Sequence, residues 1–354
     1  MRGAVIRRSP TIGRFILGAL GLLVVWVQPF TGLAETPPGL LSPEENSLTP
    51  PPERDWERLG IRESELRILE RFHRGGGYEG FHVAYKSTGL DITGVLARPY
   101  IPDEDTMFPA IILNHGSAGG VTAPYRAVAL DLARRGYVVL ASTYRGRAGP
   151  EGRSQGLVEL AKGEVIDVLQ LTQLARKLEY VDPRRVGIMG EGEGGAITLQ
   201  AIERSNVFEA AVVISPPLFS GMAETGYAGL GYLRERSAQL FGREMPESAL
   251  IRELYAREMF RDARRIRTPL LFITSNTDLN YPVQSRFVAR LGEMGIDHRF
   301  LDYEGMFADF MTASNSPDRP SNWNQVRDEA WGEVFRFLAE HVEPGGKPKP
   351  ESTP

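Results

Sequence analysis

The chain has 354 residues, and 42% of them are hydrophobic, which is enough for the core of one large α/β domain or of two small ones. Its 41 lysines and arginines nearly balance its 45 aspartates and glutamates, which gives no reason to expect nucleic acid or an anionic membrane surface as a partner. Cysteine is absent, so the sequence excludes disulfides, a cysteine nucleophile and thiolate metal sites.

Residues 1–34 have the order of a secretory signal peptide. Arginines at positions 2, 7, 8 and 14 precede an apolar run at 15–27, and the small residues Gly32 and Ala34 follow at a spacing typical of a cleavage site. The run is shorter than the roughly 18–20 residues that a transmembrane helix needs. We therefore expect an exported protein, periplasmic or secreted, with no membrane contact after cleavage. An uncleaved N-terminal anchor is the alternative.

Two further segments lack a hydrophobic period. Residues 35–54 are rich in proline and polar groups, which predicts a disordered linker. The tail at 344–354 has a similar composition and the same prediction. Residues 55–343 between them form the expected domain, in which we find no internal repeat.

The domain alternates strand and helix patterns along the chain. Strands at 81–87 and 92–99 are expected to form a hairpin, with the turn at 89–91. Continuous apolar runs, typical of strands buried on both faces, follow at 109–116, 137–146, 184–190, 209–217, 269–276 and 298–305. Helical patterns lie at 125–136, 159–178, 194–203 and 325–341. The alternation predicts a mostly parallel sheet with helices on both faces.

The alternation stops between residues 217 and 268, where a helix-prone insertion of about 50 residues intervenes. An insertion that follows the carboxyl end of a strand lies over the crevice where such sheets bind ligands. We therefore predict that residues 217–268 form a cap or lid, with a plain surface excursion as the alternative.

Five segments resemble, in the same order, motifs of the α/β-hydrolase superfamily and, within it, of its dienelactone hydrolase and prolyl-oligopeptidase-like branch of serine hydrolases. They are NHGSAGG at 114–120, STYRGRAGPEG at 142–152, VDPRRVGIMG at 181–190, SNTDLNYPVQS at 275–285 and LDYEGMFADF at 301–310. The resemblance covers residues 81–341. It implies the α/β-hydrolase fold, a mostly parallel twisted sheet with helices on both faces and a helical cap. It also implies an ester, amide or peptide hydrolase with a Ser-His-Asp triad. We expect no cofactor and no metal.

The nucleophile position is substituted. The family's G-x-S-x-G pattern places its serine on a strained strand-to-helix turn, and here that pattern falls on residues 190–194, with Gly192 at the serine. Glycine has no side chain to attack a carbonyl, so the covalent step lacks its agent. Glycine also removes a backbone strain of order 1–3 kcal/mol, because it adopts positive φ without penalty.

The histidine position is substituted as well. The resemblance places Ala308 at the histidine and Asp278 at the catalytic acid. No shift of a few residues brings a histidine to position 308, because the five histidines lie at 73, 82, 115, 298 and 341. Without a histidine to orient, we expect Asp278 to hydrogen-bond within its own loop, as aspartates in turns commonly do.

An oxyanion site is expected to survive in part. The resemblance assigns it the backbone N–H of Glu193 and one N–H near Gly116 or Ser117, donors that hold a carbonyl or carboxylate. We therefore expect a small acyl-type or peptide ligand in the crevice. A dinucleotide site is disfavoured because the glycines have the wrong third spacing. A metal site from Glu191, Glu193 and Asp278 is disfavoured because it lacks histidine.

Together these patterns predict a catalytically inactive member of the family, which acts as a binding or interaction module. The alternative is an active ester, amide or peptide hydrolase that uses groups other than those at positions 192 and 308. A third interpretation, that these two positions were changed by design, is opposed by the export segment that the chain retains. The oligomeric state is left open.

Overall fold

The computed structural model describes residues 5–6, 65–116, 118–222, 225–226, 228–241, 243–312 and 319–348. The predicted linker at 35–54 lies outside these residues. So does the predicted signal peptide at 1–34, except for the two-residue strand β1 (Val5–Ile6), which pairs with β12. Within the described ranges, no helix is long and apolar enough to cross a membrane.

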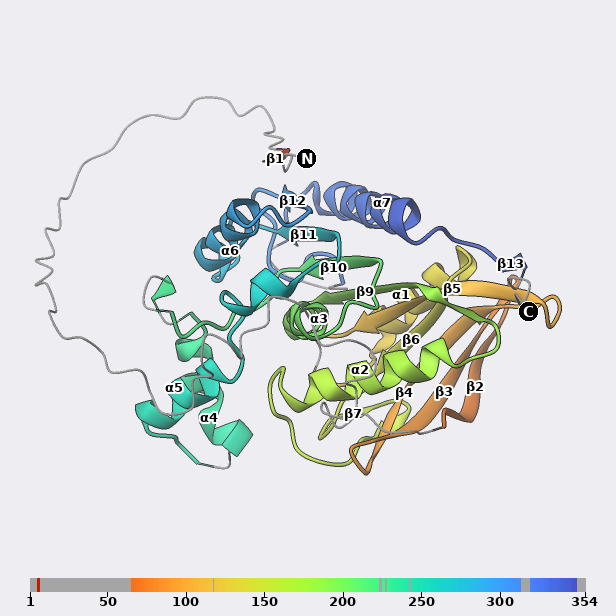
Figure 1. The fold of residues 1–354 in the computed structure, drawn as a ribbon, viewed down its shortest axis with the longest axis horizontal. Coiled ribbons are helices and arrows are strands. Elements are labelled where there is room, and N and C mark those ends of the chain that lie inside the picture. The colour runs from red at the N-terminus through yellow and green to blue at the C-terminus, as the bar shows by residue number, and fades with distance from the viewer. Residues whose placement is uncertain are drawn as a thin grey trace, which may run out of the picture.

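One large sheet, with strand order β1-β12-β11-β10-β9-β5-β6-β4-β3-β2, forms the centre of the domain, and β13 pairs with β5 (Figure 1). Strands β5, β6 and β9 to β12 run parallel, whereas β2, β3 and β4 are antiparallel. The strands are β2 (Arg67–Gly75), β3 (Tyr78–Ser87), β4 (Leu90–Pro99), β5 (Thr106–Asn114), β6 (Val138–Ser142), β9 (Val181–Glu191), β10 (Ala210–Ile214), β11 (Leu270–Thr274), β12 (His298–Asp302) and β13 (Lys347–Pro348). A separate hairpin joins β7 (Ala148–Gly149) to β8 (Gly152–Arg153).

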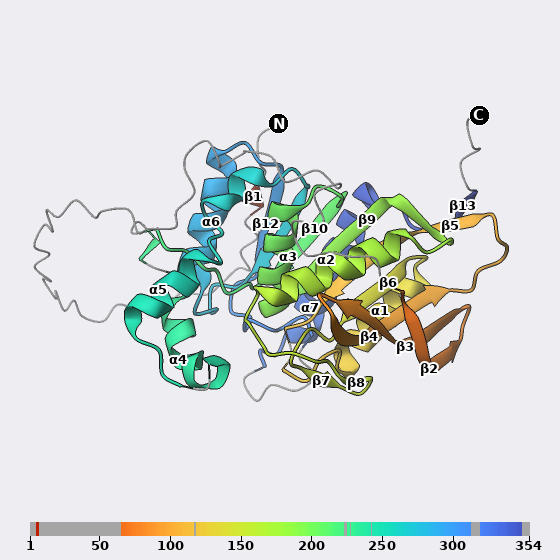
Figure 2. The same cartoon turned by 60° about the horizontal axis from the view of Figure 1, so that its bottom comes forward.

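Helices cover both faces of this sheet, as Figures 1 and 2 show. They are α1 (Ala123–Arg134), α2 (Gly163–Arg176), α3 (Glu193–Arg204), α6 (Tyr281–Glu293) and α7 (Trp323–His341). Residues of β5 alternate between two cores, with Ile112 packed in the core of α2, α3 and α6 and Ile111 in that of α1 and α7. Because both faces are buried, the central strands read as continuous apolar runs, and the predicted layered fold is confirmed.

The connections from β5 and β9 diverge at the centre of the sheet. The chain passes from β5 through α1 to β6, then through α2 to β9, which lies on the other side of β5. Asn114 at the end of β5 is in register with Gly190 near the end of β9. Ligands of open α/β sheets bind at such a switch point, outside the carboxyl ends of the strands. The oxyanion motif and the nucleophile motif follow these two strands directly.

The helices expected in the insertion are present as α4 (Leu230–Phe241) and α5 (Glu247–Tyr255), followed by the 3-10 turn η3 (Asp262–Arg265). Both views place α4 and α5 beyond α3, on the side away from β2 (Figures 1 and 2). The guanidinium of Arg257 donates to the carbonyl of Leu160 at 2.6 Å, which ties the insertion to the segment before α2. Whether residues 217–268 close over the crevice stays a prediction.

Two strands differ from the sequence-based expectation. Strand β2 was not predicted, because most of its residues are exposed, four of the nine are charged, and they show no alternation of polar and apolar residues. The tail at 344–354 was expected to be without structure, yet Lys347–Pro348 pairs with β5. The pairing is supported by the N–H of Gly345, which donates to the carbonyl of Gly136 at 3.1 Å.

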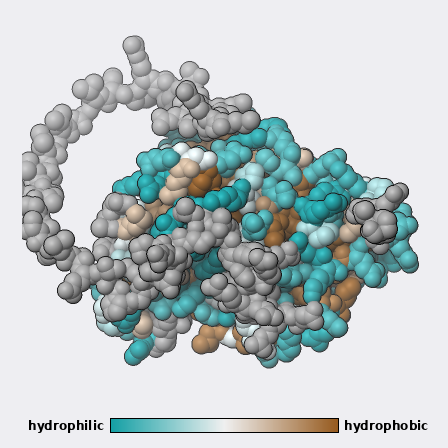
Figure 3. All heavy atoms as spheres, in the orientation of Figure 1, coloured by the Kyte–Doolittle hydropathy of each residue, from teal (hydrophilic) through white to brown (hydrophobic). Residues whose placement is uncertain are grey.

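On the face shown in Figure 3, hydrophilic residues predominate and hydrophobic ones are scattered in small groups.

Candidate active site

A sharp turn joins the end of β9 to the start of α3. Its central residue, Gly192, has φ 57° and ψ −127°, a conformation that strains any residue with a side chain. The N–H of Gly192 donates to the carbonyl of Ile214 at 2.8 Å, and its own carbonyl accepts the N–H of Ala196 at 3.1 Å. The segment therefore has the strand–turn–helix geometry expected of a nucleophile elbow.

The glycines of this turn have different reasons to be glycine. A Cβ atom at Gly190 would lie 2.2 Å from the carbonyl oxygen of Gly194, and one at Gly194 would lie 2.2 Å from that of Asn114. A Cβ atom at Gly192 would meet only the Cα of Gly116, at 3.8 Å. Close backbone packing therefore forbids side chains at 190 and 194, whereas position 192 has room for one.

The predicted acid, Asp278, is buried and has neutral hydrogen-bond partners. Asp278 follows β11, and its Oδ1 accepts the N–H of Asn280 at 2.8 Å. Its Oδ2 accepts the side-chain amide of Gln284 at 2.8 Å, and that amide also donates to the carbonyl of Pro216 at 3.0 Å. Amide groups therefore hold this carboxylate in place of an imidazole.

Ala308 lies half-buried in the loop that follows β12, residues 303–312, here called the 303–312 loop. The hydroxyls of Ser275 and Thr277 both donate to the carbonyl of Met306, and the N–H of Gly305 donates to Asn276 Oδ1 at 2.9 Å. The structure therefore brings the acid loop and the 303–312 loop together, as a triad would require, with a methyl group at the histidine position.

The five histidines lie at other places in the fold than the predicted histidine position, 308. His73 and His82 lie on β2 and β3 near the edge of the sheet, His298 begins β12, and His341 ends α7. His115 lies within the oxyanion motif; the residue is 1% exposed, and its ring stacks on Tyr144 with 4.1 Å between ring centroids. Its burial and stacking are those of a packed core residue.

The residues assigned to the oxyanion site are placed only in part. Ser117 lies outside the described residues. The N–H of Gly116 donates to the hydroxyl of Tyr125 at 2.9 Å, so this donor is engaged by a side chain. Glu193 begins α3, where the first N–H groups of a helix have no intrahelical partner. Its side-chain carboxylate forms an ion pair with Arg147, which offsets its charge beside the turn.

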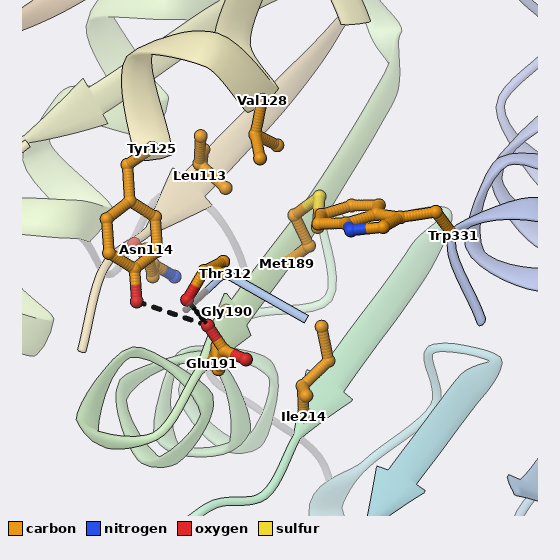
Figure 4. Close-up of a pocket in the computed structure, with 10 residues that line it drawn as sticks. All are labelled: Leu113, Asn114, Tyr125, Val128, Met189, Gly190, Glu191, Ile214, Thr312 and Trp331. Carbon is orange, nitrogen blue, oxygen red and sulfur yellow. Dashed lines mark hydrogen bonds between the residues drawn. The ribbon is translucent and has the colours of Figure 1, made fainter. Parts of the chain in front are cut away.

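Glu191 is a site residue whose contacts sequence analysis missed. It is 3% exposed, and its Oε2 accepts hydrogen bonds from the hydroxyls of Thr312 and of Tyr125, the latter at 3.4 Å (Figure 4). Burial, together with the negative charge of Asp309, raises the pKa of Glu191 to about 7. The signal for it in the sequence is a carboxylate that directly follows the apolar strand run at 184–190.

Comparison with known proteins places this geometry in a family. Residues 125–306, just over half of the chain, match the model of the prolyl oligopeptidase family. The uncharacterized peptidase YuxL of Bacillus subtilis is 28% identical over 229 residues, which are 61% of this chain and 33% of YuxL. The uncharacterized peptidase YtmA of the same organism is 29% identical over 213 residues, 59% of this chain and 77% of YtmA. The chain thus matches only about a third of the length of YuxL.

Among solved structures, acetyl xylan esterase 1 from Thermoanaerobacterium sp. superposes with a TM-score of 0.59 at 17% sequence identity. The superposition covers 83% of this chain and 96% of the esterase. At this identity the likeness shows the fold alone, and it confirms the α/β-hydrolase architecture that the motif order implied. By fold and by sequence match, the chain belongs to the prolyl oligopeptidase family.

Proposed function

We propose that this protein is an exported pseudoenzyme of the prolyl oligopeptidase family, which uses the crevice of a hydrolase to bind a ligand without cleaving it. The observation that carries the proposal is an elbow with the expected backbone geometry and open space at position 192, but with no nucleophile there. A scaffold whose geometry is kept while the reactive atoms are missing is expected where binding, and not turnover, is the function.

The second triad position supports the same proposal. The acid loop and the 303–312 loop are tied together through Met306, yet the residue at the histidine position is Ala308. Loss of triad members costs a serine hydrolase roughly a million-fold in rate, and what remains comes from binding and the oxyanion donors. With glycine at 192 and alanine at 308, a Ser-His-Asp mechanism has neither its nucleophile nor its base at these positions.

The ligand class follows from the groups that remain. The N-terminus of α3 points its backbone donors at the carboxyl edge of the sheet, and such donors hold a carbonyl or carboxylate oxygen. Two relatives of the chain are named as uncharacterized peptidases and one structural neighbour as an acetyl xylan esterase, and peptide and ester bonds both join an acyl group. We therefore infer a small acyl-type or peptide ligand.

Restoring the missing groups tests whether the scaffold is intact. We expect the double variant Gly192→Ser/Ala308→His to hydrolyse p-nitrophenyl acetate at least about tenfold faster than either single variant, since a nucleophile needs its base. The two single variants are the controls. Adding Asp278→Asn should reduce the gain, because it removes the carboxylate that would orient the histidine. A folded double variant no faster than its controls would show that the crevice has diverged beyond its triad.

A further inference from the structure

The segment that leads into α2 contains two successive residues in a strained conformation. Leu160 and Ala161 have φ of 54° and 53°, in the left-handed region that residues with a Cβ atom seldom adopt. Both side chains are buried in the core with α2 and α3. Strained backbone persists only where the surrounding structure holds it, so contacts from outside this turn have to fix its conformation.

Three elements supply contacts to residues 159–162, here called the strained turn. The carboxylate of Glu164, at the start of α2, accepts three backbone N–H groups of the turn at 2.6 to 3.1 Å. The side-chain amide of Gln200, on α3, donates to the carbonyl of Ala161. The third element is the insertion at 217–268, which reaches the turn through the side chain of Arg257.

Arg257 holds two successive carbonyls of the strained turn. Its Nε donates to the carbonyl of Leu160 at 2.6 Å, and its Nη2 donates to that of Glu159. Its Nη1 donates to the carbonyl of Glu253 at 2.6 Å and to the carboxylate of the same residue at 2.8 Å, which fixes the side chain against α5. The residue is 1% exposed. The planar fork of a guanidinium group suits it to grip two neighbouring acceptors at once.

The two ends of the insertion meet beside Arg257. The carboxylate of the next residue, Glu258, accepts the N–H of Gly221 at 2.6 Å and that of Phe260 at 2.9 Å. The N–H of Met259 donates to the carbonyl of Phe219 at 3.0 Å. A displacement of this stem would therefore displace the guanidinium group that holds the strained turn.

The strained turn is connected in turn to the oxyanion motif. Arg145 donates from Nη1 to the carboxylate of Glu159 at 2.9 Å, and its backbone N–H donates to the carboxylate of Asp167 at 2.9 Å. The preceding residue, Tyr144, also has a positive φ, of 52°. Its hydroxyl donates to the carbonyl of His115 at 3.2 Å, and its ring stacks on that residue. Two consecutive residues thus join the turn to the oxyanion motif.

We propose that Arg257 is a positioning residue, through which the insertion holds the strained turn and thereby the oxyanion motif beside the elbow. When the stem is displaced, two buried carbonyls lose their donors, and Leu160 and Ala161 relax to negative φ. The contact of Glu159 with Arg145 then loosens as well. This coupling goes beyond the proposed binding function, because it operates whether the crevice binds a ligand or cleaves one.

Strain distinguishes this role from that of an ordinary buried side chain. If Arg257 contributes hydrogen bonds alone, its loss should affect the turn equally with alanine or with glycine at position 161. If Arg257 holds the turn against strain, Ala161→Gly should offset its loss, because glycine adopts a positive φ without penalty. The two substitutions together therefore separate the two roles.

Hydrogen exchange of the whole protein, measured by mass spectrometry and corrected for intrinsic exchange rates, tests the proposal. In Arg257→Lys, which keeps the charge but loses the fork, we expect exchange of residues 159–162 to become about tenfold faster or more. Exchange of residues 142–147 should become faster as well, and that of β11 should not change, which controls for global unfolding. In Arg257→Lys/Ala161→Gly, exchange of residues 159–162 should return most of the way to that of the natural protein.

A matched control is Arg234→Lys, because Arg234 is an arginine of the insertion whose ion pair with Glu247 is exposed. It should change neither segment. Unchanged exchange of residues 159–162 in Arg257→Lys, or an effect that Ala161→Gly does not reduce, would overturn the proposal. Faster exchange at 159–162 without any change at 142–147 would overturn the coupling to the oxyanion motif. If Arg257→Lys fails to fold, Glu253→Ala removes the carboxylate that orients the guanidinium group, with the same expected and contradicting results.

Discussion

At the scale of single residues, the proposed site rests on two positions, 192 and 308, without the side chains of a triad, and on a buried glutamate beside one of them. Gly192 and Ala308 follow from motif positions, so the sequence alone indicated the absent nucleophile and base. The contacts of Glu191 do not follow from any motif, because its partner Thr312 lies 121 residues further along the chain. The amide of Gln284 on Asp278 was equally hidden, since only the packing of α6 under the acid loop creates that contact.

The glycines of the elbow give a prediction at this scale. We expect Gly190→Ala to lower the free energy of unfolding by about 3 kcal/mol or more, because its Cβ would lie 2.2 Å from the backbone carbonyl oxygen of Gly194 and the backbone would have to shift. Gly192→Ala is the matched variant, with only the strain of positive φ to bear, about 1–3 kcal/mol. Urea denaturation measures both. Equal losses, or a greater loss at 192, would contradict the assignment of open space to that position.

At the scale of secondary structure, the strands that sequence patterns indicated most clearly are those covered by helices on both faces. Continuous apolar runs predicted β5, β6 and β9 to β12, because helices cover both sides of these strands. Strand β2 was not predicted because its residues are largely exposed. Strand β13 was not predicted because two residues are too few to show a pattern. The predicted turn at 89–91 instead lies at Thr88 and Gly89, both with positive φ.

The C-terminal strand gives a prediction at the same scale. A chain that ends at Pro344 loses the pairing of β13 with β5 and the hydrogen bond from Gly345 to Gly136. We expect it to be less stable by about 1–2 kcal/mol, the net contribution of one or two hydrogen bonds. A chain that ends at Pro348 keeps these contacts and is the control. Equal denaturation midpoints for the two chains would show that the β13 pairing contributes no stability.

At the scale of the whole molecule, the fold and the chemistry are separable. The parallel sheet, the switch point between β5 and β9 and the joined loops are those of a hydrolase. The order of the motifs along the chain was predictable, because each motif follows a strand whose apolar residues indicate that it is buried. The hydrogen bonds between the loops were not predictable, because short polar side chains of a kind common in surface loops form them. A complete scaffold around an incomplete triad is the basis of the proposed binding function.

The most direct test of this account is to treat the purified protein with a fluorophosphonate probe and to measure intact mass, together with turnover of an activated ester. A protein without a nucleophile at position 192 should gain no covalent phosphonate and should hydrolyse the ester no faster than buffer. The variant Gly192→Ser/Ala308→His serves as the positive control. A stoichiometric adduct on any serine of the natural protein, or catalytic turnover, would contradict the central claim that this member of the family has lost its reaction.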